Sequence, residues 1–131
     1  TNQIFTPKTM VKKMVDMLEQ ENPGCFDMPD KTFIDLYMKS GLYITEIVKR
    51  LYQSDTMKKQ FPDNKERLKH IFEKQVYGLA PTEIIYKIAT SYILGFDEDT
   101  KNMKHNFRQL DALPYAKDGT LQQALDELYP E

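Results

Sequence analysis

The segment 32–46, TFIDLYMKSGLYITE, limits the choice of fold more than any other part of the chain. Apolar residues at 33–37 predict a short buried strand, the polar turn 39–41 ends in glycine, and the apolar spacing over 43–51 predicts a helix. A strand, glycine turn and helix in succession place free helix N–H groups at the carboxyl end of a strand, where nucleotide-like ligands bind in open α/β sheets. Asp35 falls at that strand end, where a carboxylate can face a ligand amine or hydroxyl. Ordinary strand–helix turns have the same form, and the G-x-G-x-x-G spacing of a dinucleotide site is absent.

The rest of the chain continues this alternation of helices and strands. Apolar periodicity, caps and breakers predict helices from Thr6-Pro7 to Asn22, over 44–52, after Asp63, after Thr82 and after Thr120, with strands at 75–79 and 106–110. The stretches 25–31 and 96–106 are interpreted as loops, and 53–64 is a polar stretch broken by Pro62. We therefore predict an α/β fold: a partial Rossmann-like parallel sheet with flanking helices, preceded by the N-terminal helical segment 1–24. Three strands make a thin sheet, which we interpret as half of a doubly wound domain, with residues 1–131 as a single domain.

Two of these helices carry apolar stripes that we expect to pack in the core. The stripe of the first helix comprises Met10, Val11, Met14, Met17 and Leu18. The stripe of the helix that follows Thr82 comprises Ile84, Ile85, Ile88, Ala89 and Tyr92.

Composition excludes several classes of function. A formal charge of −2 is no attraction for a polyanion, so this chain is not expected to hold most of a DNA-binding face, although it can belong to a larger DNA enzyme. One cysteine, Cys25, and two histidines argue against a disulfide and a metal site. No apolar run approaches the roughly 20 residues of a membrane span, so we expect a cytoplasmic chain without a membrane partner. The basic stretch 58–74 is either a solvated helix face or a phosphate-contacting patch.

Four motifs together resemble a known family. Gln3-Ile4-Phe5-Thr6-Pro7, Phe33-Ile34-Asp35 through Ser40-Gly41, Tyr77-Gly78-Leu79 and Leu110-Asp111-Ala112-Leu113 occur in this order over nearly the whole chain. The order is similar to the start of adenine-specific DNA methyltransferases of restriction–modification systems, which use S-adenosylmethionine. In that family an F-T-P element precedes a D-P-x-x-G-S-G type loop, a second strand ending in an acidic segment, and a third strand ending in Asp or Asn.

The resemblance implies a cofactor role for each matching residue. At the methionine end it implies that Phe5, Thr6 and Pro7 fold over the cofactor, that Asp35 accepts from the ammonium group, and that Lys39, Ser40 and Gly41 form the holding turn. At the nucleoside end it implies Asp111 as acceptor for the adenine amino group and Leu113 near the ring face. Three of these residues also have simpler structural explanations: Thr6 can be a helix cap, Asp35 a turn former and Asp111 a surface carboxylate.

The chain also departs from the family pattern. Lys39 replaces a glycine, Leu36 replaces a proline, and the acid expected after the second strand is displaced to Glu83, in the first turn of a helix. A lost charge-assisted acceptor costs about 1.5–3 kcal/mol, so the grip on the ribose is expected to be weak. These departures favour the alternative that the chain is a degenerate, non-enzymatic interaction module. A P-loop is a poorer alternative, because the glycine-rich lead is absent.

The family's catalytic N-P-P-Y motif is missing. Leu113-Pro114-Tyr115 lacks the Asn and the first Pro and follows the third strand directly, so we reject it and assign no catalytic residue. The family spacing places the true motif a few residues beyond Glu131. The resemblance therefore implies an S-adenosylmethionine-binding part that is inactive alone, whose intact parent enzyme binds double-stranded DNA and has a possible restriction endonuclease or specificity partner.

Overall fold

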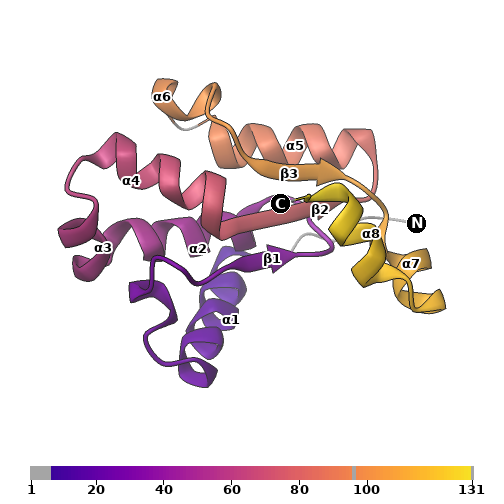
Figure 1. The fold of residues 1–131 in the computed structure, drawn as a ribbon, viewed down its shortest axis with the longest axis horizontal. Helices are drawn as coiled ribbons and strands as arrows, with labels where there is room; N and C mark the ends of the chain where they lie inside the picture. The colour runs from indigo at the N-terminus through magenta and orange to yellow at the C-terminus, as the bar shows by residue number, and fades with distance from the viewer. Residues whose placement is uncertain (1–6, 96, 131) are drawn as a thin grey trace.

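The computed structural model describes residues 7–95 and 97–130, and a three-strand parallel sheet lies at its centre. The strands β1 (Phe33–Asp35), β2 (Val76–Ala80) and β3 (Asn106–Gln109) follow the order β1-β2-β3, with Asp35 opposite Gly78 and Gly78 opposite Phe107. All three arrows in Figure 1 point to the same end of the molecule, where α7 and α8 lie. The predicted α/β class and partial Rossmann-like sheet are confirmed.

Helices connect and flank these strands. The helix α1 (Lys8–Glu21) precedes β1; α2 (Leu42–Gln53), α3 (Asp55–Gln60) and α4 (Asn64–His70) connect β1 to β2; α5 (Glu83–Leu94) and α6 (Glu98–Lys101) connect β2 to β3; α7 (Ala112–Asp118) and α8 (Leu121–Leu128) follow. Two single turns complete the list, the 3-10 turn η1 (Cys25–Asp27) and the π-helical turn η2 (Ile71–Gln75). The caps Asp63 and Thr82 are confirmed, because their side chains accept from the backbone N–H groups of Glu66 and Ile85.

The core lies on one face of the sheet. Alternation along β2 turns Val76 and Ala80 toward this face, where they join buried apolar residues of α1, α2, α4 and α5. Gly78 lies between them, and a Cβ there would come 2.4 Å from Sδ of the fully buried Met38. A larger residue in the middle of this strand would therefore have to displace the methionine that packs across it.

The opposite face carries Tyr77, and the end of α8 covers part of it. Tyr129 packs edge-on against Tyr77 at 5.1 Å between ring centroids, and its hydroxyl donates to the Asn106 carbonyl oxygen at 2.7 Å. The Arg108 guanidinium lies over the same ring at 5.7 Å. Burial raises the pKa of Tyr129 to about 12, so this hydroxyl stays protonated and keeps its donor role at neutral pH.

The loop before β1 is held by side chains of the α4–η2 segment. Gln75 is fully buried and its amide donates to the carbonyl oxygens of Met28 and Lys31, at 2.9 and 3.0 Å. His70 Nε2 lies 2.7 Å from the Pro29 carbonyl oxygen. These bonds fix the entry of the chain into β1 and therefore the position of its carboxyl end.

Both apolar stripes were predicted too broadly. Met10, Met14 and Met17 are 51%, 45% and 56% exposed, whereas Val11 and Val15 are the buried residues of α1. In α5 the exposed residues are Ile84, Ile88 and Tyr92, and the buried ones are Ile85, Ala89, Ile93 and Leu94. Helical spacing identifies an apolar sector, but the neighbouring elements cover only the narrow part of it that faces them.

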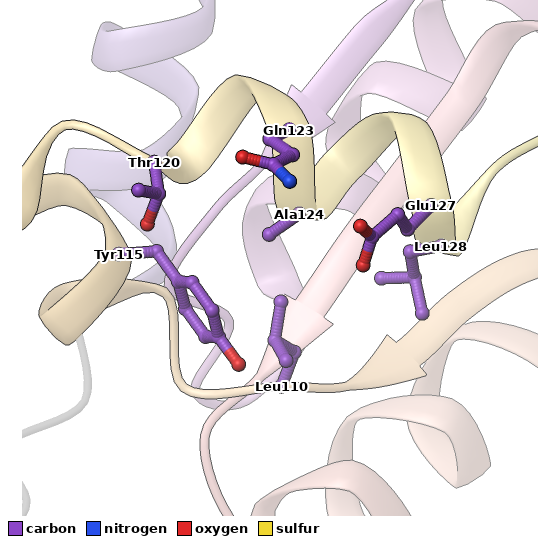
Figure 2. Close-up of a pocket in the computed structure, with 7 residues that line it drawn as sticks. All are labelled: Leu110, Tyr115, Thr120, Gln123, Ala124, Glu127 and Leu128. Atoms are coloured by element: carbon purple, nitrogen blue, oxygen red, sulfur yellow. The ribbon is translucent and has the colours of Figure 1, made fainter.

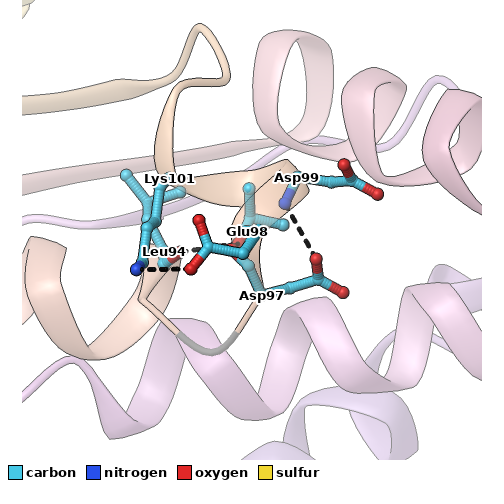
Figure 3. A network of polar contacts seen from close by, with 6 residues as sticks. Leu94, Asp97, Glu98, Asp99 and Lys101 are labelled. Carbon is cyan, nitrogen blue, oxygen red and sulfur yellow. Dashed lines mark hydrogen bonds and ion pairs between the residues drawn. The ribbon is translucent and has the colours of Figure 1, made fainter.

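Short helices occur in three stretches that were interpreted as loops or as polar, and one predicted helix cap is not formed. The polar stretch 53–64 contains α3, which Ser54 begins by accepting from the N–H of Met57, and 25–31 contains η1. The stretch 96–106 contains α6, which Asp97 begins by accepting from the N–H of Asp99, while Lys101 pairs with Glu98 at 2.9 Å (Figure 3). Thr120 precedes α8 as predicted but makes no capping bond with its side chain. One-turn helices depend on local caps, so apolar periodicity does not reveal them.

A pair of substitutions in α1 tests which side of this helix is buried. We expect Val15→Ala to lower the free energy of unfolding by about 2 kcal/mol, because it removes apolar volume from a fully covered site. Met17→Gln is expected to change it by less than about 0.5 kcal/mol. Urea denaturation of both variants measures the difference, and equal losses would contradict the packing of α1 described above.

Candidate functional site

The candidate site begins where β1 ends. The carboxylate of Asp35 accepts a hydrogen bond from the backbone N–H of Tyr37 at 3.0 Å, which bends the chain directly after the strand. The N–H of Met38 then donates to the Leu79 carbonyl oxygen at 2.8 Å and holds the loop against β2. The loop is therefore fixed at both ends before the polar turn starts.

The turn 39–41 passes into α2 through a left-handed glycine. Gly41 has φ +90°, and its carbonyl oxygen accepts from the N–H of Thr45 at 3.0 Å and from the Thr45 hydroxyl at 2.8 Å. A Cβ at Gly41 would lie 3.0 Å from the Ala89 carbonyl oxygen and 3.0 Å from Cγ1 of Ile93. Close packing of this turn on α5 therefore requires the glycine, in addition to its positive φ.

The loop encloses one side of a cavity of about 210 Å³, and α1 supplies the other side. The lining residues are Val11, Met14, Asp35, Tyr37, Lys39, Ser40, Gly41, Leu42 and Tyr43. Four predicted site residues, Asp35, Lys39, Ser40 and Gly41, are thus brought together in one cavity. Leu42 was not predicted as a site residue, and neither were Val11, Met14, Tyr37 and Tyr43. Their signal was available: an i, i+3 pair in the helix after Thr6-Pro7, and aromatic residues flanking the turn.

An ion-pair network holds α1 in position beside this cavity. The Arg50 guanidinium on α2 contacts Asp16 of α1 at 2.8 Å and Glu46 of its own helix at 2.8 Å. It also lies 6.0 Å from the ring centroid of Phe26. Because Val11 and Met14 line the cavity, this contact between α1 and α2 positions the wall that they form.

The carboxylate of Asp35 contributes a negative charge to the lining of the cavity. It is half-buried, and within residues 7–95 and 97–130 no lysine or arginine forms an ion pair with it. Desolvation raises the pKa of Asp35, and the hydrogen bond from Tyr37 opposes the shift only in part. The pKa of Tyr43 is raised as well, first by burial and then by the negative charge of Asp35.

The other predicted site residues lie outside this cavity. Phe5 and Thr6 fall outside the described residues. Pro7 directly precedes α1, and its carbonyl oxygen accepts from the N–H of Val11 at 3.0 Å. Glu83 is exposed in the first turn of α5 and pairs with Lys87 at 3.0 Å.

Asp111 and Leu113 lie at the start of α7. Asp111 is exposed and caps this helix by accepting from the N–H of Leu113 at 3.2 Å, and Leu113 is 47% exposed. Because the strands are parallel, Asp111 follows β3 at the same end of the sheet as Asp35, but it lies two strands across and four residues beyond Phe107, the residue in register with Asp35 through Gly78. The two carboxylates share an edge, but Asp111 is not among the residues that line the cavity beside Asp35.

A larger cavity, of about 440 Å³, opens beside the end of β3. Figure 2 shows Tyr115 of α7 and Gln123 and Glu127 of α8 around it, with Leu110 and Ala124 between them. This cavity is bounded by α7 and α8, and it includes none of the predicted cofactor residues. Size alone would favour it as a binding site. The smaller cavity, however, contains the half-buried carboxylate of Asp35, whose pKa is raised, and such a group is typical of a specific polar site.

Other kinds of site receive no support from the described residues. Within the described ranges, no group of three or more His, Cys, Asp or Glu side chains is arranged to hold a metal ion. No helix described in the structure is both long and apolar enough to cross a bilayer.

Comparison with known proteins bears on the broad class of the chain. No protein-family model matches the chain. A Mycoplasma pneumoniae protein named "Uncharacterized adenine-specific methylase" is 30% identical over 82 residues, which are 63% of this chain and 19% of that protein. The match therefore spans about a fifth of the relative's length. It supports a relationship to methyltransferases at the level of the broad class.

Two glycine substitutions separate backbone strain from packing at the turn. Gly41→Ala is expected to destabilise the chain by about 2–4 kcal/mol, because it combines a left-handed alanine with overpacking against α5. Gly119→Ala is the matched control: Gly119 also has a positive φ, but a Cβ there meets nothing within 4 Å. We expect it to cost only about 1–2 kcal/mol in the same urea denaturation. Equal costs would show that the contact with α5 contributes nothing.

The raised pKa of Asp35 leads to a prediction about stability. A carboxyl group whose pKa is higher in the folded chain binds protons more readily there, so its contribution to stability falls as pH rises above the ordinary value of 3.8. Asp35→Asn should therefore raise the unfolding midpoint at pH 7 in the absence of ligand, and this gain should shrink as pH falls toward 3.8. Thermal unfolding of the parent chain and of the variant at several pH values measures this difference in unfolding midpoint. A variant that is less stable than the parent chain at pH 7 would contradict the prediction.

Proposed function

We propose that this chain is the S-adenosylmethionine-binding part of a site-specific DNA adenine methyltransferase of a restriction–modification system. One observation carries the proposal: Asp35, Lys39, Ser40 and Gly41 line a single cavity where β1 meets α2, at the carboxyl edge of a parallel sheet. Ligands bind at this edge in open α/β folds. The similarity to the Mycoplasma pneumoniae protein named as an adenine-specific methylase agrees in class.

The donor and acceptor chemistry of the cavity suits the methionine end of the cofactor. The free oxygen of the Asp35 carboxylate would accept from the ammonium group, since only Oδ1 is engaged by the N–H of Tyr37. Ser40 Oγ already accepts from the N–H of Leu42 at 3.3 Å and would offer its proton to the cofactor carboxylate. When bound, the cofactor supplies an electrophilic methyl group.

The nucleoside end would extend along the sheet edge. Asp111 lies two strands across the sheet from Asp35 and beyond the end of β3, and there it would accept from the adenine amino group, with Leu113 beside the ring. Glu83 is exposed and paired only at the surface, so it would have to leave Lys87 to reach the ribose. This supports a weak hold on the ribose.

In the intact parent enzyme, we propose that the methyl group is transferred to the exocyclic amine of an adenine flipped out of double-stranded DNA. Catalysis of this kind depends on positioning the amine in line with the methyl group. The chain contains no N-P-P-Y segment to hold that amine, so we expect no DNA methylation by the chain alone. A restriction endonuclease or specificity subunit would be a partner of the parent enzyme.

The second candidate is an interaction module that binds a partner protein and no cofactor. The size of the cavity favours it, because about 210 Å³ is less than the roughly 300 Å³ at which most small-molecule sites begin. The replacements at Leu36 and Lys39 point the same way.

Calorimetric titration of the full chain with S-adenosylmethionine distinguishes these candidates. We expect saturable heat of binding, and we expect Asp35→Asn to weaken the affinity about tenfold to a hundredfold through loss of a charge-assisted hydrogen bond. Glu127→Gln is the matched control, because it makes the same carboxylate-to-amide change in the larger cavity; its affinity should equal that of the parent chain. Absence of binding at millimolar ligand, or loss of binding in Glu127→Gln alone, would overturn the proposed function.

A further inference from the structure

The cavity after β1 has two walls that come from separate segments of the chain. Residues 35–43 form one wall, and Val11 and Met14 of α1 form the other. A ligand that contacts both walls is held well only if α1 keeps its place, because binding groups must lie within about 0.5 Å of their best positions. The contacts of α1 with its neighbours therefore bear on ligand affinity, even where they lie outside the cavity.

Apolar packing fixes the rotation of α1 only weakly. Val11 and Val15 are its buried residues, Leu18 is partly buried, and helical spacing places all three on one strip of the helix. Met14 lies beside this strip and is 45% exposed. Apolar burial is non-directional, so a single strip fixes the distance of α1 from the core better than its rotation about its own axis.

Asp16 lies on the other side of this strip from Met14. At about 3.6 residues per turn, Asp16 follows Val15 by about 100° around the helix, whereas Met14 precedes Val15 by about the same angle. The carboxylate of Asp16 contacts the Arg50 guanidinium of α2 at 2.8 Å. The ion pair and the apolar strip together hold α1 along two lines, which fixes its rotation and therefore the direction in which Met14 faces.

Arg50 is itself held on its own side of this contact. Its Nε donates to the Glu46 carboxylate at 2.8 Å, and its guanidinium lies 6.0 Å from the ring centroid of Phe26. Burial alone would lower the pKa of Arg50, but the hydrogen bonds to Glu46 and Asp16 raise it, so attraction outweighs the desolvation of the guanidinium. A side chain fixed in this way loses little conformational freedom when it pairs with Asp16.

The helix that carries Arg50 also carries part of the other wall. α2 begins directly after Gly41, and its first two residues, Leu42 and Tyr43, line the cavity. Arg50 follows Tyr43 by about two helical turns and so lies on the same face of α2. Because Gly41 packs on α5, α2 is a rigid link between the two walls, and the ion pair with Asp16 joins the second wall to it.

We propose that Asp16 and Arg50 are positioning residues of the candidate site: their ion pair sets the orientation of the α1 wall and thereby the affinity for S-adenosylmethionine. The proposal rests on the proposed function and adds to it two residues that keep the binding site in shape. Neither is among the described residues that line the cavity, so neither is expected to contact the ligand.

Calorimetric titration with S-adenosylmethionine tests this inference on the full chain, on Asp16→Asn, on Arg50→Gln and on the double variant. We expect each single variant to weaken binding about threefold to fivefold, the range of a partly exposed ion pair. The double variant should weaken it no further, because either substitution already breaks the pair. Asp16→Glu keeps the carboxylate and should retain most of the affinity.

The signs of the two effects separate positioning from long-range electrostatics. Asp16→Asn removes a negative charge and Arg50→Gln removes a positive one, so a purely electrostatic effect on a charged ligand would have opposite signs in the two variants. Positioning predicts weaker binding in both. The ratio of the affinities of the parent chain and Asp16→Asn should also approach one as NaCl is raised from about 0.05 to about 0.5 M, because salt screens an exposed ion pair.

Glu98→Gln is the matched control. It makes the same carboxylate-to-amide change in an exposed ion pair of α6, where Glu98 contacts Lys101 at 2.9 Å, and its affinity should equal that of the parent chain. Thermal unfolding of each variant verifies that it is folded. Asp16 is 54% exposed, so Asp16→Asn and its salt dependence provide the test if Arg50→Gln does not fold.

The outcomes separate this inference from the proposed function. Unchanged affinity in the single variants, effects of opposite sign, or an equal loss in Glu98→Gln would overturn the inference and leave the cofactor site in place. Losses that add in the double variant would also overturn it. A parent chain that does not bind S-adenosylmethionine would overturn the proposed function, and this inference with it.

Discussion

The close approach of the turn before α2 to α5 is the constraint on which the candidate site depends. A Cβ at Gly41 would lie 3.0 Å from atoms of α5, so the turn packs this closely only because glycine has no side chain. Its φ of +90° is a second reason for glycine at this position. This packing, with the bond from the N–H of Met38 to Leu79, fixes both ends of the segment that carries the lining side chains. The second wall depends on a contact of another kind, the Arg50 ion pair with Asp16 that joins α1 to α2.

The site departs from what stability alone would select. A half-buried carboxylate that forms no ion pair within residues 7–95 and 97–130 costs free energy, as the raised pKa of Asp35 expresses. Asparagine would accept the same hydrogen bond from Tyr37 without that cost. A local feature that lowers stability is expected where a ligand supplies the missing interaction. The carboxylate of Asp35 is such a feature, and it lies in the loop that the resemblance to methyltransferases also identifies.

Sequence patterns predicted the fold better than they predicted the walls of the site. The apolar runs around Phe33 and Val76 and the caps Asp63 and Thr82 are local signals, so the parallel sheet and its main helices followed from them. The prediction that the methionine stripe of α1 is buried was wrong. Helical spacing defines an angular sector of the helix, whereas burial depends on which neighbouring elements cover that sector. The cavity residues Tyr37 and Tyr43 were missed for a related reason: their roles follow from the arrangement of the turn against α1.

The central claim is that ligand binding occurs in the cavity after β1 and not in the larger one between α7 and α8. Amide NMR spectra of the full ¹⁵N-labelled chain, recorded during titration with S-adenosylmethionine, test it most directly. The account predicts saturable shifts for the amides of residues 35–43 and of Val11 and Met14, with those of residues 120–128 unchanged. Shifts concentrated in residues 110–128, or spectra that do not change at millimolar ligand, would contradict it.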